Sequence, residues 1–468
     1  MTQIESVETV SHAGKWKPYP AYKDSGVEWL GEIPIHWEVE RLKFNSYIKG
    51  RIGWQNLRSD EFTDTGPYLI TGMHFNQGSI DWDACYHITE ERYEMAPEIQ
   101  VKEHDVLITK DGSIGKVAYI EYLPGKASLN SHLLVIRPLG GRYVPRYLYY
   151  LLLSSVFRSY ILLNQAGSTF FGISQESVVN FLMMLPTLEE QDAVAVFLNS
   201  ETTKISTLIA KKERLIELLQ EKRAALISHA VTKGLDPTVP MKDSGVEWLG
   251  EIPAYWEVKR LKFVADVLNG VTKGRDLGQR EVVELPYLRV ANVQDGYLDL
   301  SDIAMIIVGV DEVERYSLQR GDVLMNEGGD FDKLGRGYVW DGAITPCLHQ
   351  NHVFAVRPHL GVDSYWISII TLTSYAKHYF ILKSKQSTNL ASISGTNLKE
   401  LPVLMPPEDE RNAILNYIKV TTAKIDTLIS RIREDIEKLK EYSAALISAA
   451  VTGKIDVRET IADYSEDR

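Results

Sequence analysis

Residues 23–44 read KDSGVEWLGEIPIHWEVERLKF, and residues 242–263 read KDSGVEWLGEIPAYWEVKRLKF. The two stretches are identical at 19 of 22 positions and lie 219 residues apart. Self-similarity of this strength at a fixed offset indicates a duplicated structural unit. The architecture of this chain of 468 residues therefore follows from the duplication.

Weaker matches continue the repeat through both halves of the chain. They keep the order of short motifs rich in β-branched residues and glycine, which are DVL at 105–107 and 322–324, GKVAYI at 115–120 and GRGYVW at 335–340, HLLVIRP at 132–138 and HVFAVRP at 352–358, IS at 173–174 and 393–394, and FLMMLP at 181–186 and LPVLMP at 401–406. Short strands and turns followed by helical stretches such as 147–163 predict a domain that mixes strands and helices, although the strand order does not follow from the sequence.

A long helical segment containing the motif AALIS closes each copy. Apolar side chains recur at spacings of three and four residues, which predicts an amphipathic helix with a coiled-coil seam. The predicted seam positions are Ile205, Leu208, Leu215, Leu219 and Leu226 in the first helix and Ile425, Leu428, Ile432, Leu439, Tyr442 and Leu446 in the second. Lys212, Lys222 and Asp435 interrupt the seam, which lowers stability but can fix the register.

Both helices carry end signals. Thr187 and Glu190 form a predicted capping box before the first helix, and Pro407 suits the first turn of the second. Gly234 and Gly453 are expected to end the two helices.

The predicted order of units is domain, helix, domain, helix. The boundaries are an N-terminal extension (1–22), a first domain (23–186), a first helical region (187–236), a second domain (237–406), a second helical region (407–455) and a C-terminal tail (456–468). Each apolar seam needs a partner, and a dyad relating the two halves makes the helices antiparallel. The predicted fold class is α+β, with two pseudo-symmetric α/β domains separated by two long antiparallel coiled-coil helices.

This arrangement suits a DNA ligand. A helix of about 40 residues is roughly 60 Å long, enough to hold two domains a turn or more apart on duplex DNA, where one turn is about 34–36 Å. The domains diverge sharply outside the shared segments, so they are expected to read different half-sites. The sequence thus predicts an asymmetric bipartite target with an unread spacer.

The composition excludes several other classes of protein. The 44% hydrophobic and 24% charged residues are typical of a folded protein, no apolar run approaches the roughly 20 residues of a membrane span, and the acidic start predicts a cytoplasmic chain without a signal peptide. Cys85 and Cys347 are too few for a disulfide framework or a cysteine-ligated zinc site. The net charge is −12, and residues 1–188 and 237–407 each carry 17 basic and 21 acidic side chains. Any DNA surface must therefore be a local stripe.

The duplicated WLGEIPxxWEVxRLKF segment, the DVL and RP strands, the IS turn and the AALIS helix resemble the specificity subunits of type I restriction-modification systems, over residues 23–455. The resemblance implies two target-recognition domains that bind double-stranded DNA. It also implies a subunit without a catalytic site that assembles with two modification subunits and two restriction subunits. S-adenosylmethionine, ATP and Mg²⁺ are then expected on those partners and no cofactor on this chain.

The same resemblance implies that the helices dock the modification subunits. The family's E-Q pair after the proline run is present as Glu190 and Gln191 in the first copy, whereas the second copy has Glu410 and Arg411. These four residues are the expected docking positions, and docking there is expected to be asymmetric.

Base contacts require polar side chains on loops, because these match the donors and acceptors of the major groove. The candidates occupy equivalent loops: Lys110, Ser113, Lys116, Asn130 and His132 in the first domain, and Asn326, Lys333, Arg336, Gln350 and His352 in the second. For each residue alone, the alternative of an ordinary hairpin turn or a structural histidine stays open.

A second group follows the repeated segment in each copy and suits contacts to phosphates, which position a protein without specifying a sequence. It comprises Arg51, Gln55 and Asn56 in the first copy and Lys273 and Arg275 in the second. A solvated loop is the alternative for this group. The recurring Trp29, Trp37, Trp248 and Trp256 are interpreted as framework residues rather than base-stacking platforms.

The sequence contains no recognised catalytic or metal-binding motif. Residues 115–116 lack the spacing of a P-loop, no amino-methyltransferase motif such as NPPY is present, and the nuclease-like EVK at 257–259 corresponds to EVE at 38–40. We therefore expect a non-catalytic specificity subunit without a metal site. The alternatives are a DNA nuclease or methyltransferase with an unrecognised site and a coiled-coil scaffold that binds only proteins.

Overall fold

The computed structural model describes residues 16–51, 57–112, 114–164, 172–329, 334–386 and 391–460. Its contacts divide the chain into two compact units, Met1–Lys212 with Glu434–Arg468, and Glu213–Arg433. The division falls within the two long helices, so each unit contains one α+β domain and part of both helices.

The two long helices are present as α5 (Leu188–Lys233) and α10 (Glu408–Val451). The predicted capping box is confirmed, because the Glu190 N–H donates to Thr187 Oγ1 at 3.3 Å and the Thr187 N–H donates to Glu190 Oε2 at 3.3 Å. Pro407 lies immediately before α10. Gly234 and Gly453 follow the helices with φ of +75° and +71°, the left-handed conformation in which helices commonly end.

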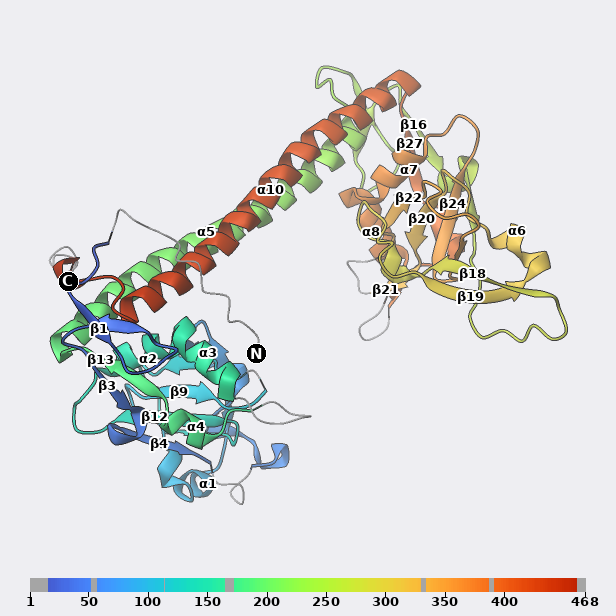
Figure 1. Ribbon diagram of the computed structural model, residues 1–468. Helices are drawn as coiled ribbons and strands as arrows, with labels where there is room; N and C mark the ends of the chain where they lie inside the picture. Colours follow the sequence, from blue (N-terminus) through green and yellow to red (C-terminus); the bar gives the residue numbers. More distant parts are fainter. Residues whose placement is uncertain are drawn as a thin grey trace. The chain divides into compact units, whose positions relative to one another are not determined.

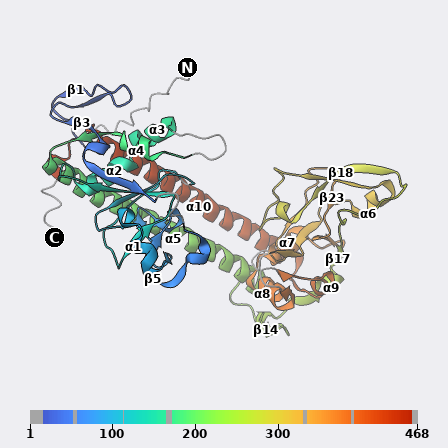
Figure 2. The ribbon, with the colours of Figure 1, turned by 90° about the horizontal axis from the view of Figure 1, so that it is seen from below.

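In the first unit, the start of α5 lies beside the end of α10 (Figures 1 and 2). Phe197 of α5 shares a core with Leu446 and Ala450 of α10, whereas Lys212, further along α5, pairs with Asp435, which is earlier in α10. The two helical segments of this unit are therefore antiparallel.

The second unit repeats this packing with the other helix ends. Ile227 of α5 shares a core with Ile414 and Ile418 of α10, and Arg223, earlier in α5, pairs with Asp426, which is later in α10. These segments are antiparallel as well. The C-terminal end of α5 therefore packs in the core of the second domain, and the C-terminal end of α10 packs in the core of the first.

The predicted seam is correct in part. Several predicted positions are buried, namely Ile205, Ile425, Ile432 and Leu446. Leu208, Leu215 and Leu428 were wrongly predicted, because they are 43%, 43% and 45% exposed. Ile429 and Ile436 are buried instead, since the row 425, 429, 432, 436 is the one that faces the partner helix. Lys222 is exposed, and the adjacent Arg223 is half-buried.

The first domain contains two sheets. A four-stranded antiparallel sheet has the order β10-β9-β12-β4, with β4 (Ser46–Gly50), β9 (Val106–Thr109), β10 (Val117–Tyr119) and β12 (Leu133–Pro138). A three-stranded sheet has the order β11-β5-β8, with β5 (Thr63–Ile70), β8 (Tyr86–His87) and β11 (Ala127–Leu129). The predicted helical stretch is divided into α2 (Pro145–Leu153) and α3 (Ser155–Asn164), and α2 packs on the four-stranded sheet.

The repeated segment connects the domain to the helix that follows it. Its strands are β1 (Tyr22–Asp24), β2 (Glu32–Pro34) and β3 (Glu38–Arg41), and β3 pairs with β13 (Leu182–Leu185), the Pro-ended run before α5. Shorter elements complete the domain: β6 (Phe75–Asn76), β7 (Ser79–Ile80), α1 (Glu90–Glu94) and α4 (Gln175–Val179). Trp37 and its counterpart Trp256 are fully buried, as expected for framework residues.

The second domain has the matching topology. Its four-stranded sheet has the order β17-β24-β20-β22, formed by β17 (Ala265–Leu268), β20 (Val323–Asn326), β22 (Gly337–Val339) and β24 (Val353–Pro358). Its three-stranded sheet has the order β19-β18-β23, formed by β18 (Val282–Leu288), β19 (Ala304–Gly309) and β23 (Leu348–His349). The helices α7 (Ser364–Thr371) and α8 (Ser374–Lys383) correspond to α2 and α3.

The second domain contains further short elements. They are β14 (Met241–Asp243), β15 (Glu251–Pro253), β16 (Glu257–Arg260), α6 (Val313–Tyr316), α9 (Gly395–Lys399) and β27 (Pro402–Met405). A small sheet is formed by β21 (Gly328–Gly329), β26 (Ala391–Ser392) and β25 (Lys385–Gln386). None of the helices in the described part of the chain combines the length and the apolar character that a membrane crossing needs.

Candidate nucleic-acid interface

A buried ion pair fixes the four-stranded sheet of the first domain. Asp105 is fully buried, and its carboxylate oxygens accept from Arg137 Nε at 2.7 Å and Nη2 at 2.6 Å. These hydrogen bonds raise the pKa of the Arg137 guanidinium. Asp105 Oδ2 also accepts from the Lys102 N–H at 2.7 Å. The aspartate of DVL and the arginine of the RP strand thereby hold β9 and β12 side by side.

The second domain has the same pair. Arg357 donates to Asp322 through Nε and Nη2, both at 2.8 Å, and Asp322 also accepts from the Gln319 N–H at 2.8 Å. The recurring motifs thus encode an interaction that was not recognised from the sequence. The pair lies at one end of two neighbouring strands, and the loops that carry several predicted base-contact residues lie at the other end.

In the first domain, those loops meet at Lys110, the residue after β9. Its N–H donates to the His132 carbonyl at 2.9 Å, and its carbonyl accepts from the Ile173 N–H at 2.7 Å. His132 also receives support from two neighbours, because its N–H donates to Asn130 Oδ1 at 3.1 Å and its Nδ1 lies 2.5 Å from Asp111 Oδ1. The structure therefore brings together the predicted residues Lys110, Asn130 and His132.

In the second domain, the equivalent loops meet at Glu327, the residue after β20. Its N–H donates to the His352 carbonyl at 2.9 Å, and its carbonyl accepts from the Ile393 N–H at 2.8 Å. His352 Nδ1 lies 2.7 Å from Glu327 Oε2, and the Gln350 N–H is bonded to the end of β18. Gln350 and His352 are thus brought together beside Glu327. Sequence reasoning missed Glu327, although its place after the DVL strand matches that of Lys110.

Two further predicted base-contact residues, Lys116 and Arg336, lie in the turns before β10 and β22. Lys116 is exposed, and its N–H donates to Thr109 Oγ1 at 2.9 Å. Arg336 is half-buried, and its carbonyl accepts from the Asn326 N–H at 2.9 Å. Asn326 itself is 2% exposed and donates through Nδ2 to the Val293 carbonyl at 3.0 Å. Asn326 therefore holds the loop, whereas Lys116 is presented on the surface.

The residues predicted to contact phosphates differ in burial and in their hydrogen-bond partners. Arg51 is 5% exposed, and its Nε donates to the Leu129 carbonyl at 2.8 Å. Burial lowers the pKa of Arg51 to about 10. Arg275 makes a bidentate pair with Glu312 at 2.7 and 3.0 Å, whereas Lys273 is exposed. Four predicted contact residues lie outside the described residues, namely Gln55, Asn56, Ser113 and Lys333.

The residues expected to dock a partner connect parts of their own unit. In the first unit, Glu190 accepts from His36 Nε2 at 2.9 Å, and its side chain is 7% exposed. Gln191 is fully buried and accepts from the Val144 N–H at 2.8 Å. These bonds tie the start of α5 to the repeated segment and to the turn before α2.

The second unit makes corresponding bonds with different side chains. Glu410 accepts from Trp256 Nε1 at 2.9 Å and from the Tyr255 hydroxyl at 3.0 Å. Arg411 is 5% exposed and donates through Nη2 to the Gly361 carbonyl at 3.3 Å, in the turn before α7. Arginine therefore replaces glutamine without losing the contact to this turn.

The acidic side chains are concentrated in one segment of each domain. Residues 57–96 carry eight acidic and two basic side chains, and residues 276–316 carry nine and three, so these two segments together account for the whole net charge of −12. Outside them, residues 1–188 carry 15 basic and 13 acidic side chains, and residues 237–407 carry 14 and 12. The rest of each domain is therefore slightly basic. The net negative charge of the chain thus disfavours binding of DNA phosphates less strongly there than in the two acidic segments.

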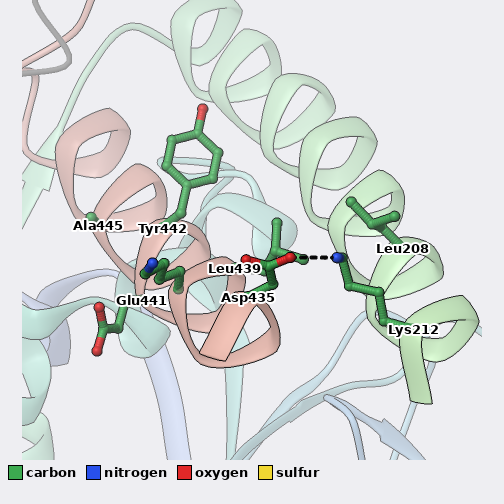
Figure 3. A pocket seen from close by; sticks show the side chains of 8 residues that line it. Leu208, Lys212, Asp435, Leu439, Glu441, Tyr442 and Ala445 are labelled. Carbon is green, nitrogen blue, oxygen red and sulfur yellow. Dashed lines mark hydrogen bonds and ion pairs between the residues drawn. The ribbon is translucent and has the colours of Figure 1, made fainter. Parts of the chain in front are cut away.

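The helices of the first unit also leave apolar surface exposed. A pocket of about 520 Å³ lies between α5 and α10. Figure 3 shows Leu208, Leu439 and Tyr442 among the residues that line it. The Lys212–Asp435 ion pair, at 2.9 Å, crosses it.

Comparison with known proteins gives a consistent result. Residues 35–218 and 253–438 match the family described as type I restriction modification DNA specificity domain. The type I restriction enzyme EcoKI specificity subunit of Escherichia coli K12 is 24% identical over 439 residues, which is 91% of this chain and 90% of the relative. The MjaVIII specificity subunit of Methanocaldococcus jannaschii is 25% identical over 435 residues, 91% of this chain and 94% of the relative.

A solved structure has the same fold. It comes from a study of complex assembly and conformational transition of the type I R-M system, and it is 16% identical with a TM-score of 0.65. The similarity covers 90% of this chain and 99% of the solved chain.

Proposed function

This chain belongs to the family of type I restriction modification DNA specificity domains, and we propose that each of its two domains reads one half of an asymmetric bipartite DNA target. The family is non-catalytic, so the chain acts as the DNA specificity subunit of its system. The proposal concerns how the target is read and what the partners contribute.

One observation carries the proposal: each domain presents a loop cluster with the same backbone bonds and different side chains. The first cluster presents Lys110, Asn130 and His132, and the second presents Glu327, Gln350 and His352. The histidines are exposed and the other four residues are half-buried, and polar side chains of this kind match the hydrogen-bonding edges of bases in the major groove. Different side chains on one frame favour two different half-sites.

The remaining functions belong to the assembly. We propose that α5 and α10 set the spacer between the half-sites, and that their exposed apolar side chains, such as Leu208 and Leu428, contact the modification subunits. Two modification and two restriction subunits would supply S-adenosylmethionine, ATP and Mg²⁺ chemistry. Cellular DNA as the target makes the cytoplasm the expected location.

A domain exchange tests the reading of two half-sites. Residues 45–185 are replaced by the corresponding domain of another family member, and the methylated motif is determined by sequencing the DNA of cells that also express the modification partner. One half-site should change while the other half-site and the spacer stay the same. A change in both half-sites, or in neither, would contradict independent reading.

An insertion tests the spacer. Four residues added after Ala210 lengthen α5 by roughly 6 Å, which corresponds to about two base pairs. The preferred spacer should lengthen with both half-sites unchanged. An unchanged spacer in an active complex would refute the role proposed for the helices.

A further inference from the structure

Lys110 and Glu327 occupy the same position in two matching hydrogen-bond networks. Each is the first residue after the strand that bears the buried aspartate. Each donates its N–H to the carbonyl of the recurring histidine, at 2.9 Å in both domains. Each also accepts from the isoleucine N–H of the IS motif, at 2.7 Å in the first domain and 2.8 Å in the second.

Because both backbone partners are the same, the two side chains leave the frame from equivalent points. Their chemistry is opposite, since a lysine ammonium only donates hydrogen bonds and an ionised carboxylate only accepts them. A difference of this kind, at a position that the two domains share, changes which bases can be recognised without changing the fold.

The neighbouring side chains preserve this difference. In the first domain Asp111 takes the Nδ1 contact of His132, so the histidine is held without Lys110. In the second domain Glu327 itself holds His352, and its carboxylate is fixed by that contact. The two histidine side chains are similarly exposed, at 61% and 57%. Both histidines are therefore paired with a carboxylate, but in the first domain that carboxylate comes from Asp111, so the position shared with Glu327 carries the ammonium of Lys110.

We infer that the position shared by Lys110 and Glu327 is a specificity determinant that reads equivalent places in the two half-sites with opposite polarity. Lys110 donates to base acceptors such as guanine O6 and N7, and Glu327 accepts from the amino group of cytosine or adenine. This inference rests on the proposed function and specifies which residues distinguish the two half-sites.

The test uses the chain assembled with its modification partners and a pool of duplexes randomised over both half-sites. Lys110→Glu should shift the preferred base at one position of one half-site, and Glu327→Lys should shift one position of the other. The relative preference for the original base should fall by roughly tenfold or more, which is the scale of one specific base contact. Lys110→Gln and Glu327→Gln should weaken the same preferences without the full reversal.

The controls make the same charge changes elsewhere in each domain. Lys102→Glu alters an exposed lysine at the opposite end of β9, and Glu314→Lys alters an exposed glutamate in α6. Both should leave the selected motif unchanged. Hydrogen exchange at the Ile173 and Ile393 amides shows whether the backbone hydrogen bonds of each loop cluster are kept. Where a charge-reversal variant loses these bonds, the base preference of the glutamine variant is used for the test instead.

Several results would overturn the inference. An equal loss of affinity for all sequences with an unchanged motif would make these residues phosphate contacts. An unchanged motif with unchanged affinity, or the same shift in the control variants, would also refute it. If the wild-type complex selects no bipartite motif, the proposed function fails; if it does and the variants leave both half-sites unchanged, only this inference fails.

Discussion

In the first domain the position after the central strand carries Lys110, and in the second it carries Glu327, with the same two backbone hydrogen bonds. At the opposite end of the same strands the domains do not differ, because Asp105 and Asp322 each form the same buried pair with an arginine. One end of the sheet is thus held constant while the other varies. The comparison teaches that the recurring motifs build the support and that the residues between them carry the difference.

The largest effect is expected where the two domains agree. Asp105→Ala should destabilise the first unit by about 3 kcal/mol, because it leaves the guanidinium of Arg137 without its buried partner. Asp322→Ala should destabilise the second unit to the same extent through Arg357. The arginines are 24% and 30% exposed, which places the loss at the lower end for a broken buried pair.

Hydrogen exchange resolved by peptide during denaturant titration assigns each loss to a unit. Asp64→Ala removes an exposed aspartate of the first unit and should have little effect. Unequal losses for the two buried aspartates, or a loss spread over both units, would show that the two sheets are not supported in the same way.

A smaller effect tests which helix end belongs to which domain. Ser448 of α10 accepts through Oγ from the Ser155 N–H at the start of α3, and Ser228 of α5 accepts from the Ser374 N–H at the start of α8, both at 2.9 Å. Each bond satisfies a helix N-terminal donor, so replacement by alanine should cost about 1 kcal/mol. Ser448→Ala should increase exchange in α3, and Ser228→Ala in α8.

Ser430→Ala, at an exposed position of α10, is the matched control. The opposite assignment, in which Ser228→Ala loosens α3, would contradict the packing of each helix end in the other domain.

The sequence predicted local features well because their causes are local. The capping box at Thr187 and the glycines that end the helices depend on residues within a few positions of one another. The repeat extended these predictions from one half of the chain to the other. The serine of AALIS was recognised only as part of a motif, because its partner lies 293 residues away at Ser155.

The seam shows the limit of periodicity. Leu208 and Leu215 are seven residues apart, as seam residues should be, but both are exposed, and the residues that follow them, Ile209 and Ile216, are half-buried. Which of two neighbouring rows is buried depends on the partner helix, and the sequence of one helix does not contain that information. Glu327 was missed for a different reason, because its place after the DVL strand matches that of Lys110 but its residue type does not.

A third test concerns the pH dependence of stability. It uses two buried histidines whose equivalent positions in the other domain carry residues that do not titrate. His74 of the first unit corresponds to Asn292, since each accepts a main-chain N–H from three residues before, and His349 of the second corresponds to Leu129 at the end of the equivalent strand. Burial lowers the pKa of both histidines. The unfolded chain therefore binds protons more readily, and stability falls as the pH drops below about 6.5.

At pH 6 the loss is at most about 0.8 kcal/mol for each histidine. His74→Asn should remove the acid sensitivity contributed by this residue in the first unit, and His349→Leu should do so in the second. Thermal unfolding with unit-resolved exchange at pH 8 and pH 6 checks this. A difference between wild type and variant that does not change with pH would refute the titration and leave only a packing effect.

The smallest effect concerns the polar residues within the helix pair. Lys212 and Arg223 are two half-buried cations of α5, and they pair with Asp435 and Asp426, whose side chains are 52% and 53% exposed. Pairs this exposed contribute less than about 1 kcal/mol, and a leucine in the seam gains a comparable amount by burial. Lys212→Leu should therefore leave the first unit equally stable or raise its stability by about 0.5 kcal/mol, whereas Lys222→Leu, on the exposed side, should give no gain. Denaturant midpoints measure the stability of both variants.

The Lys212–Asp435 pair can also fix the register of the two helices. In that case the Lys212→Leu variant should accept a wider range of spacers in the duplex selection, so that a gain in stability comes with a loss of discrimination between spacer lengths. A destabilised variant with unchanged spacer preference would contradict both parts of this argument.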